Sequence, residues 1–458
     1  MRRNLTGNSL IMKPIQVGLL GIGTVGSGVF NVLNRNQEEI RRRAGRGIEI
    51  ACVADLDVGR ARSVVGDAAQ VVADARAVIA NPDIDIVVEL IGGYGIAKAL
   101  VLEAIAAGKH VVTANKALLA VHGTEIFAAA SAKGVMVAFE AAVAGGIPII
   151  KALREGLTAN RIQWIAGIIN GTTNFILSEM RDKGLDFDVV LKEAQRLGYA
   201  EADPTFDIEG VDAAHKATIM SAIAFGIPVQ FDKAYVEGIT KLGAADIRYA
   251  EQLGYRIKLL GIARRRTGGA DGVELRVHPT LVPAKRLIAN VEGAMNAVVV
   301  QADAVGTTLY YGKGAGSEPT ASAVIADLVD IARLAAADPE HRVPHLAFQP
   351  HTLDEARDAL PVLPMTEVVT SYYLRLRVAD EAGVLAKVTG LLAGADISID
   401  AVLQREADEV GGEGSTHTDL IILTHETREG TMNDAIAQMQ ALPTVLGPIV
   451  RIRKEELN

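Results

Sequence analysis

The sequence contains a single cysteine, Cys52, among its 458 residues. An internal disulfide is therefore excluded, and we expect the thiol to pack inside a strand in a protein of a reducing compartment. Basic residues are outnumbered as well, since 46 Lys and Arg face 55 Asp and Glu, for a formal net charge of −9. This balance argues against nucleic acid as the main partner, because no excess of basic side chains would offset the phosphates.

Long apolar runs are also missing. No stretch of 18 consecutive apolar residues occurs, and the run at 141–150 is interrupted by two glycines and a proline. The first eight residues hold two arginines, but no apolar segment follows before Lys13 and Pro14, so no targeting signal is predicted. We therefore expect a cytoplasmic protein without a membrane partner.

The first 150 residues alternate short apolar patterns with helical patterns. Strands that are apolar on both faces and separated by helices predict a parallel sheet covered on both sides, the α/β doubly wound fold. We place this domain at 12–150 and expect residues of about 310–345 to complete it. The predicted strands are 15–22, 48–55, 85–92, 110–115 and 135–143, and the predicted helices are 25–33, 97–107 and about 125–131.

The remaining chain divides in two. Residues 151–309 mix strand patterns, at 161–169 and 273–282, with helices, which predicts an α+β domain. A linker holding Pro350, Pro361 and Pro364 follows. Residues 370–458 then give strand, helix, strand, strand, helix and strand, the order of a ferredoxin-like unit.

The segment Gly21-Ile22-Gly23-Thr24-Val25-Gly26 is a GxGxxG placed between a predicted strand and a predicted helix. Gly21 permits the tight turn, Gly23 lets the backbone approach a pyrophosphate, and Gly26 allows the helix to pack closely on the strand. The helix start at Thr24 and Val25 offers N–H groups and a positive dipole to phosphates. In this context the motif predicts a dinucleotide site, whereas alone it would indicate only a glycine turn.

Asp55 closes the second predicted strand, where an acid would bond the ribose 2′-hydroxyl of NAD. Arg60 and Arg62 follow and could accept the 2′-phosphate of NADP instead. The sequence leaves NAD and NADP both open.

The segment 198–216, GYAEADPTFDIEGVDAAHK, packs five acids ahead of Lys216. If 211–223 is helical, Asp212 and Lys216 stand at i and i+4 on one face, where the carboxylate can hold the ammonium in place. A lysine held in this way can pass a proton to a carbonyl oxygen. The competing interpretation is a surface ion pair on an amphipathic helix.

At this point the chain resembles the homoserine dehydrogenase family over nearly its whole length. The resemblance rests on six segments that occur in the family's order: GIGTVG, TANK at 113–116, EAAVAGGIPII, NGTTN at 170–174, the acidic segment 198–216 and YYGKGAGSEPTASAV. It implies reduction of aspartate 4-semialdehyde to homoserine with NADPH or NADH, on the route to threonine and methionine. A non-catalytic amino-acid sensor and another two-domain amino-acid dehydrogenase remain as rival functions.

The resemblance implies that 151–309 is the substrate-binding, catalytic and dimerisation domain, and it also implies roles for individual residues. Lys216 matches the proton donor, and Asp212 would orient it. Glu201 matches a position that binds the substrate ammonium. Asp207 belongs to the same group of acidic residues in the segment 198–216, which we call the acidic wall. Lys116 would contact cofactor and substrate, although a buried structural lysine is the alternative there.

Two further sites follow from the resemblance. A monovalent cation, usually sodium, would be bound through oxygens at Glu140, Val143, Gly145 and Ile147, where the sequence alone indicates only a strand-ending turn. Gly316 would contact the cofactor, where the alternative is an ordinary helix-capping turn.

The C-terminal residues resemble an ACT domain, with Gly383 at a strand-to-helix turn whose N–H groups could hold a carboxylate. The resemblance implies feedback by threonine bound between paired modules, in a homodimer or homotetramer. Alternatively, the module only joins subunits.

Overall fold

The structure is a computed structural model that describes residues 13–267, 271–348, 360–405, 410 and 416–458. The chain divides into two compact units, Met1–Thr158 with Lys313–Pro350 and Ala159–Gly312 with His351–Asn458. The predicted domain start at residue 12 and the linker residue Pro350 lie outside the described residues. The predicted boundaries 12–150, 310–345, 151–309 and 370–458 stay predictions.

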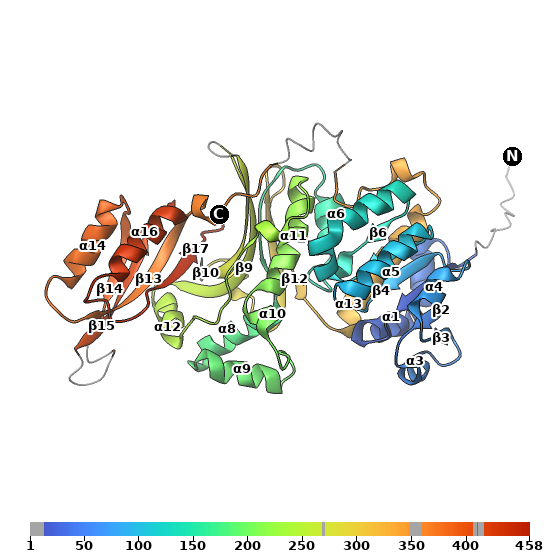
Figure 1. Cartoon of the computed structure of the whole chain (residues 1–458), viewed down its shortest axis with the longest axis horizontal. Coiled ribbons are helices and arrows are strands. Elements are labelled where there is room, and N and C mark those ends of the chain that lie inside the picture. Colours follow the sequence, from blue (N-terminus) through green and yellow to red (C-terminus); the bar gives the residue numbers. More distant parts are fainter. Residues whose placement is uncertain (1–12, 268–270, 349–359, 406–409, 411–415) are drawn as a thin grey trace, which may run out of the picture. The chain divides into compact units, whose positions relative to one another are not determined.

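The first unit is built on a six-stranded sheet in the order β3-β2-β1-β4-β5-β6, with every pair parallel (Figure 1). This is the doubly wound order, so the predicted fold class is confirmed. Two helix pairs, α1 with α13 and α5 with α6, pack in this unit. The strands are β1 Ile15–Leu20, β2 Ile48–Ala54, β3 Gln70–Val72, β4 Ile86–Glu89, β5 His110–Thr113 and β6 Val137–Ala138. The helices are α1 Thr24–Arg35, α2 Gln37–Ala44, α3 Val58–Val65, α4 Ala75–Ala80, α5 Gly95–Ala106, α6 Lys116–Lys133, α7 Ile149–Lys151 and α13 Ser317–Leu334.

The expected fifth strand at 135–143 is wrong over most of its length. Only Val137–Ala138 pairs with β5, and a 3₁₀ turn, η1, occupies Glu140–Ala142. The physical reason is the buried Asp327 of α13, whose carboxylate accepts a hydrogen bond from the Glu140 N–H at 2.8 Å and so diverts the backbone from the sheet.

The second unit carries one continuous sheet of nine strands in the order β12-β11-β7-β9-β10-β17-β13-β15-β14 (Figure 1), with short strands β8 and β16 pairing beside it. Its last four strands, in the order β17-β13-β15-β14, belong to the C-terminal module and show the predicted ferredoxin-like pattern. The strands are β7 Ile162–Ile168, β8 Tyr235–Val236, β9 Tyr255–Arg266, β10 Gly272–Pro283, β11 Met295–Ala302, β12 Gly306–Lys313, β13 Val369–Ala379, β14 Ile399–Gln404, β15 His417–Thr424, β16 Thr427–Arg428 and β17 Val450–Lys454. The helices are α8 Gly171–Lys183, α9 Phe187–Arg196, α10 Thr205–Ile208, α11 Val211–Phe225, α12 Ala244–Gln252, α14 Val384–Gly394 and α16 Glu429–Gln440.

Helix α11 confirms the predicted helix at 211–223 but is buried almost all round, with Asp212 4% and Lys216 9% exposed. The pair is therefore not a surface ion pair. His215 is fully buried between the rings of Phe206 and Phe231.

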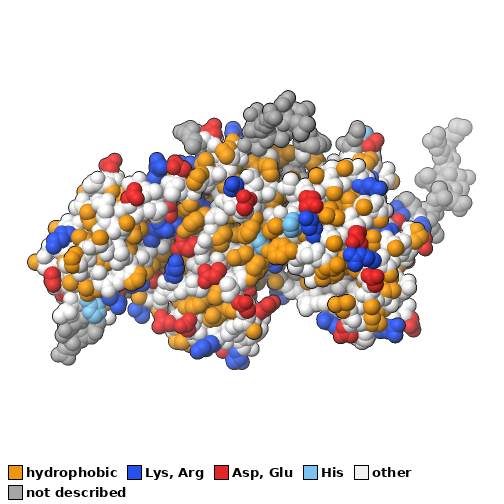
Figure 2. All heavy atoms as spheres, viewed as in Figure 1, with side chains coloured by type: hydrophobic (Ala, Val, Ile, Leu, Met, Phe, Trp, Pro, Cys, Tyr) orange, Lys and Arg blue, Asp and Glu red, His pale blue; other side chains and the backbone are white. Residues whose placement is uncertain are grey.

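Among the described helices, none is both long and apolar enough to cross a membrane. Within the same residues no group of three or more His, Cys, Asp and Glu side chains is arranged to hold a metal ion. On the face drawn in Figure 2, basic and acidic side chains are interspersed rather than gathered in a basic stripe.

Candidate active site

The glycine-rich turn of the first unit has the geometry that a dinucleotide site needs. Gly21 adopts φ +96°, and a Cβ on Gly26 would lie 2.2 Å from the Gly21 carbonyl oxygen. A Cβ on Gly23 would meet no atom within 4 Å, and no side chain caps the start of α1 there. The first turn of α1, at Thr24 and Val25, thus keeps its N–H groups available at an open surface, which fits a bound pyrophosphate.

A cavity of about 440 Å³ lies beside this turn. Its lining includes Gly21, Gly23 and Asp55. The Asp55 carboxylate accepts hydrogen bonds from the Ile22 N–H at 2.8 Å and from the Asp57 N–H at 2.9 Å. Asp55 therefore fixes the glycine turn as well as facing the cavity, a role that the sequence alone did not indicate. The lining also contains Leu56, Asp74, Arg76, Ile91 and Ile96, none of which was predicted.

Gly316 lies next to the glycine turn although almost 300 residues separate them. It precedes α13 with φ +124°, and the hydroxyl of the following Ser317 donates to the Thr24 carbonyl oxygen at 2.7 Å. A Cβ on Gly28 would lie 2.6 Å from Ser317 atoms, so the start of α13 packs directly on α1. The structure thus brings Gly316 to the site where a cofactor contact is expected.

The segment 140–147 forms a tight, irregular turn in the first unit. Glu140 is 3% exposed, and its carboxylate accepts hydrogen bonds from the Ile150 and Lys151 N–H groups at 2.9 and 2.7 Å. Burial raises the pKa of Glu140 to about 7 despite these donors. Gly145 has φ +53°, and a Cβ there would lie 2.3 Å from the Gly314 carbonyl oxygen. The turn thus combines a buried carboxylate with backbone carbonyl oxygens that lie outside the β-sheet. Oxygen atoms of these kinds are the ligands that hard cations prefer.

Lys116 begins α6 directly after β5, at the carboxyl end of the parallel sheet. Asn115 caps the helix by accepting from the Leu118 N–H at 3.0 Å and donates to the Gly93 carbonyl at 2.7 Å. These bonds fix the start of α6, and the half-buried Lys116 is placed at the strand ends where ligands bind in such folds.

The second unit holds the lysine–carboxylate pair. The Lys216 ammonium donates to Asp212 at 2.7 Å and to the Ile169 carbonyl oxygen at 2.7 Å. Both side chains come from one face of α11, as the i and i+4 spacing predicts, while Ile169 follows β7. The ammonium is therefore fixed by two oxygens in a buried setting.

Asn170 connects this pair to Asp207, and sequence reasoning missed it. Its side-chain NH₂ donates to Asp207 at 2.7 Å and to Asp212 at 2.8 Å, while its carbonyl oxygen accepts from the Thr173 N–H and caps α8. Burial, and next the Asp212 charge, raise the pKa of Asp207, whereas the Asn170 amide and Lys216 oppose the rise. The NGTTN motif was the only available signal, because Asn170 lies far from its partners in sequence.

Glu201 is not joined to this network by any hydrogen bond of the described residues. It lies in the loop between α9 and α10 with an exposed side chain, and only its carbonyl oxygen accepts a bond, from Gln195 at 3.1 Å. The Glu201 carboxylate is therefore accessible, as its expected role in substrate binding requires.

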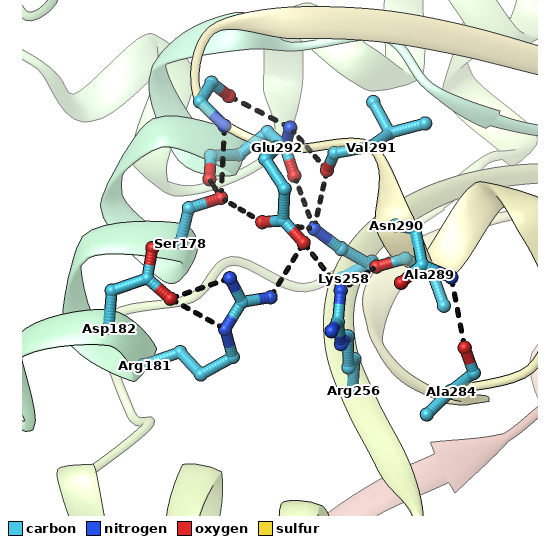
Figure 3. A network of polar contacts seen from close by, with 12 residues as sticks. Ser178, Arg181, Asp182, Arg256, Lys258, Ala284, Ala289, Asn290, Val291 and Glu292 are labelled. Carbon is cyan, nitrogen blue, oxygen red and sulfur yellow. Dashed lines mark hydrogen bonds and ion pairs between the residues drawn. The ribbon is translucent and has the colours of Figure 1, made fainter.

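A second polar network is centred on Glu292 and contacts α8 through Ser178 and Arg181 (Figure 3). Glu292 accepts hydrogen bonds from Ser178, Arg181 and Arg256 at 3.0, 2.7 and 2.6 Å. The fully buried Lys258 ammonium donates to Asn174, the last residue of NGTTN, at 3.1 Å, and burial lowers its pKa to about 8. These contacts anchor α8, the helix that Asn170 caps at its N-terminus.

Comparisons with known proteins agree with this architecture. Residues 21–140 match the family model described as homoserine dehydrogenase, NAD binding domain, residues 148–329 match homoserine dehydrogenase, and residues 372–443 match the ACT domain. The homoserine dehydrogenase of Pseudomonas aeruginosa is 61% identical over 98% of this chain and all of its own length. The chain belongs to the homoserine dehydrogenase family.

Solved structures of the family agree as well. A homoserine dehydrogenase from Thiobacillus denitrificans is 64% identical, covers 97% of this chain and 99% of its own, and has a TM-score of 0.90. A hyperthermophilic archaeal homoserine dehydrogenase in complex with NADPH covers 71% of this chain and 99% of its own, at 25% identity and a TM-score of 0.60. This member of the family is therefore an oxidoreductase that uses a nicotinamide cofactor, and not a non-catalytic sensor.

Proposed function

We propose that Lys216 is the proton donor and acceptor in the reversible reduction of L-aspartate 4-semialdehyde to L-homoserine. The reduced nicotinamide supplies a hydride to the aldehyde carbon. The developing negative charge on the aldehyde oxygen takes a proton from the Lys216 ammonium, and the same lysine accepts it in the reverse direction. The observation that carries this proposal is the buried ammonium held by Asp212 and by the Ile169 carbonyl.

The other residues are proposed to bind and orient. Glu201 and Asp207 offer carboxylates for the substrate ammonium, and Lys116 contacts substrate and cofactor. Asn170 acts as a positioning residue, because its amide nitrogen bridges the carboxylates of Asp207 and Asp212.

The 2′ position of the adenine ribose decides between the two cofactors. Asp55 suits a hydroxyl, whereas the exposed Arg60 and Arg62 suit a phosphate. Parallel NADH and NADPH titrations of the wild type and of Arg60→Ala measure the preference directly. A weaker NADPH affinity with an unchanged NADH affinity would assign the phosphate to Arg60.

The isosteric substitution Asp207→Asn is expected to raise the thermal midpoint while lowering kcat/KM. The pKa of Asp207 is raised in the folded protein, so the folded state binds more protons than the unfolded state between the two pKa values, and stability falls as pH rises through them. Removing the charge abolishes that loss, so the variant should be the more stable protein above the usual pKa of an aspartate. The gain in midpoint should be present at pH 7.5 and absent at pH 3.5; a lower midpoint at pH 7.5 would contradict the expectation.

A monovalent cation is proposed to bind at Glu140, Val143, Gly145 and Ile147. Sodium chloride should raise the thermal midpoint above that in choline chloride of equal ionic strength. The corresponding gain in the free energy of unfolding is about 1.4 kcal/mol at ten times the dissociation constant. The pKa of Glu140 is about 7, so its carboxylate is charged at pH 8 and largely neutral at pH 6, and the sodium effect should be larger at pH 8. Glu140→Gln should remove this pH dependence, whereas the control Glu155→Gln should keep it.

The C-terminal module is proposed to bind threonine and to mediate feedback, in a homodimer or homotetramer. Gly383 has φ +90° at the start of α14, and a Cβ there would meet no atom within 4 Å, so the turn is open. Light scattering of the full chain with and without threonine measures the assembly.

A further inference from the structure

The first unit buries a carboxylate that belongs neither to the glycine turn nor to the Lys216 network. Glu89 is the last residue of β4, a central strand of the parallel sheet, and its side chain is fully buried. It forms no ion pair with any basic side chain among the residues that the structure describes. Burying a carboxylate without a cation costs stability, and proteins keep such costs mainly at functional sites.

Three donors converge on the Glu89 carboxylate. Its Oε1 accepts hydrogen bonds from the Ile91 and Gly92 N–H groups, each at 2.9 Å, and its Oε2 accepts one from the Thr113 hydroxyl at 2.7 Å. The Thr113 oxygen itself accepts from the Asn115 N–H at 3.0 Å, so the hydroxyl proton is directed to Glu89. Both oxygens of Glu89 therefore act as acceptors, which is the pattern of an ionised carboxylate.

The loop that follows β4 does not by itself require a negative charge. Gly92 and Gly93 adopt φ +81° and +72°, and the Asn115 side chain fixes the loop by donating to the Gly93 carbonyl oxygen at 2.7 Å. The carbonyl oxygen of a neutral glutamine in place of Glu89 could accept from the two loop N–H groups at a lower desolvation cost. The charge of Glu89 is therefore the feature that needs a function.

Strand β4 lies on the side of the glycine turn where the nicotinamide half of the cofactor is expected. β1 ends at this turn, β2 on one side of β1 ends next to Asp55, and β4 lies on the other side. A dinucleotide with its pyrophosphate at the turn and its adenosine ribose at Asp55 extends its other half over the ends of β4 and β5. Glu89 and Thr113 end these two strands and are directly paired. A Cβ on Gly21 would lie 3.0 Å from the Leu90 carbonyl oxygen, so the turn is also close to the residue after Glu89.

We propose that Glu89 is a specificity-determining residue that favours binding of the oxidised nicotinamide cofactor relative to the reduced one. The nicotinamide ring is neutral in the reduced cofactor and positively charged in the oxidised one, because the hydride leaves with both electrons of its C–H bond. A buried negative charge attracts only the oxidised ring, and solvent screens this attraction little. The same charge stabilises the ring as the hydride passes to the aldehyde carbon. This proposal rests on the use of a nicotinamide cofactor and not on the role proposed for Lys216.

Equilibrium titrations with NADP⁺ and with NADPH test the proposal without turnover. In Glu89→Gln, the dissociation constant of NADP⁺ divided by that of NADPH should rise about tenfold above the wild-type ratio. Titrations with NAD⁺ and NADH should shift in the same way, because the ring chemistry is identical. Lys116 is present in both proteins, so its charge cancels in the comparison. An unchanged ratio in folded Glu89→Gln overturns the proposal, and so does the absence of binding of both cofactor pairs to the wild type.

Three further variants separate the charge from the contacts. Glu89→Asp keeps the charge, so its ratio should stay close to the wild-type value even where both affinities fall. A rise equal to that in Glu89→Gln would show that contacts set the ratio, and would overturn the proposal. Thr113→Val removes a hydrogen bond but no charge, so both affinities should change together. Glu125→Gln, which removes an exposed carboxylate of α6, should change neither.

A thermal melt shows whether Glu89→Gln is folded. Should it not fold, Glu89→Ala takes its place in the same comparison, because water can enter the space and bond the loop N–H groups. The expected rise in the ratio is the same, since this variant also lacks the charge. An unchanged ratio in folded Glu89→Ala overturns the proposal.

Discussion

Replacing Lys216 with alanine is expected to lower kcat by about two orders of magnitude or more, because the proton for the aldehyde oxygen is then supplied by water. The cofactor turn belongs to the other unit, so cofactor affinity should be preserved. A stopped-flow or steady-state assay of NADPH absorbance with aspartate semialdehyde measures the loss, and fluorescence titration measures cofactor binding.

Two controls make this result specific. Lys192→Ala removes an exposed lysine of α9 in the same unit and should leave kcat unchanged. Lys216→Ala also leaves Asp212 buried without its ammonium, so circular dichroism must show that the variant is folded. A folded variant with wild-type turnover would reassign the acid to another group.

Gly23→Ala is expected to weaken cofactor binding by roughly tenfold or more without lowering stability. The Gly23 backbone is extended, a conformation that alanine adopts, and the added methyl group meets no protein atom within 4 Å. It would, however, occupy the surface that a pyrophosphate approaches. Equilibrium titration with NADPH and a thermal melt measure the two effects separately.

Gly26→Ala is the matched comparison, since its methyl group would lie 2.2 Å from the Gly21 carbonyl oxygen. Both stability and cofactor affinity should fall, because backbone must move to make room. Gly156→Ala, where nothing lies within 4 Å, should change neither. Unchanged affinity in Gly23→Ala would show that the cofactor does not approach this turn.

The fold was predictable where burial leaves a clear pattern. β1, β4 and β5 are apolar on both faces, and the hydrophobicity of their sequences alone indicated a covered parallel sheet. The short edge strand β3 is half exposed and gave no such pattern. The predicted strand at 135–143 was wrong over most of its length, because the Glu140 N–H donates a hydrogen bond to Asp327, on a helix almost 190 residues later.

The site residues were predictable where their positions follow from local spacing along the chain. The bond between Asp212 and Lys216 follows from helix spacing, and Gly21, Gly23 and Gly26 follow from the turn chemistry. The double donation by Asn170 could not be predicted, because its partners are 37 and 42 residues away and meet it only when α8, α10 and α11 pack. Hydrogen bonds between polar groups that are far apart in the sequence have no local periodicity, so no sequence pattern predicts them.

Strand β10 joins β17, which the ribosome makes about 170 residues later. At roughly 5–20 residues per second, this edge waits on the order of ten to thirty seconds for its neighbour during synthesis. Its buried Glu274, Arg276 and His278 are charged or polar, and Arg276 finally bonds Glu455 at 2.6 Å. The stretch at Arg276 and Val277 already pairs with the earlier strand β8, so only the stretch at Thr280 and Leu281 waits for β17. The buried ion pair between Arg276 and Glu455 therefore forms only when the last strand of the sheet has been synthesised.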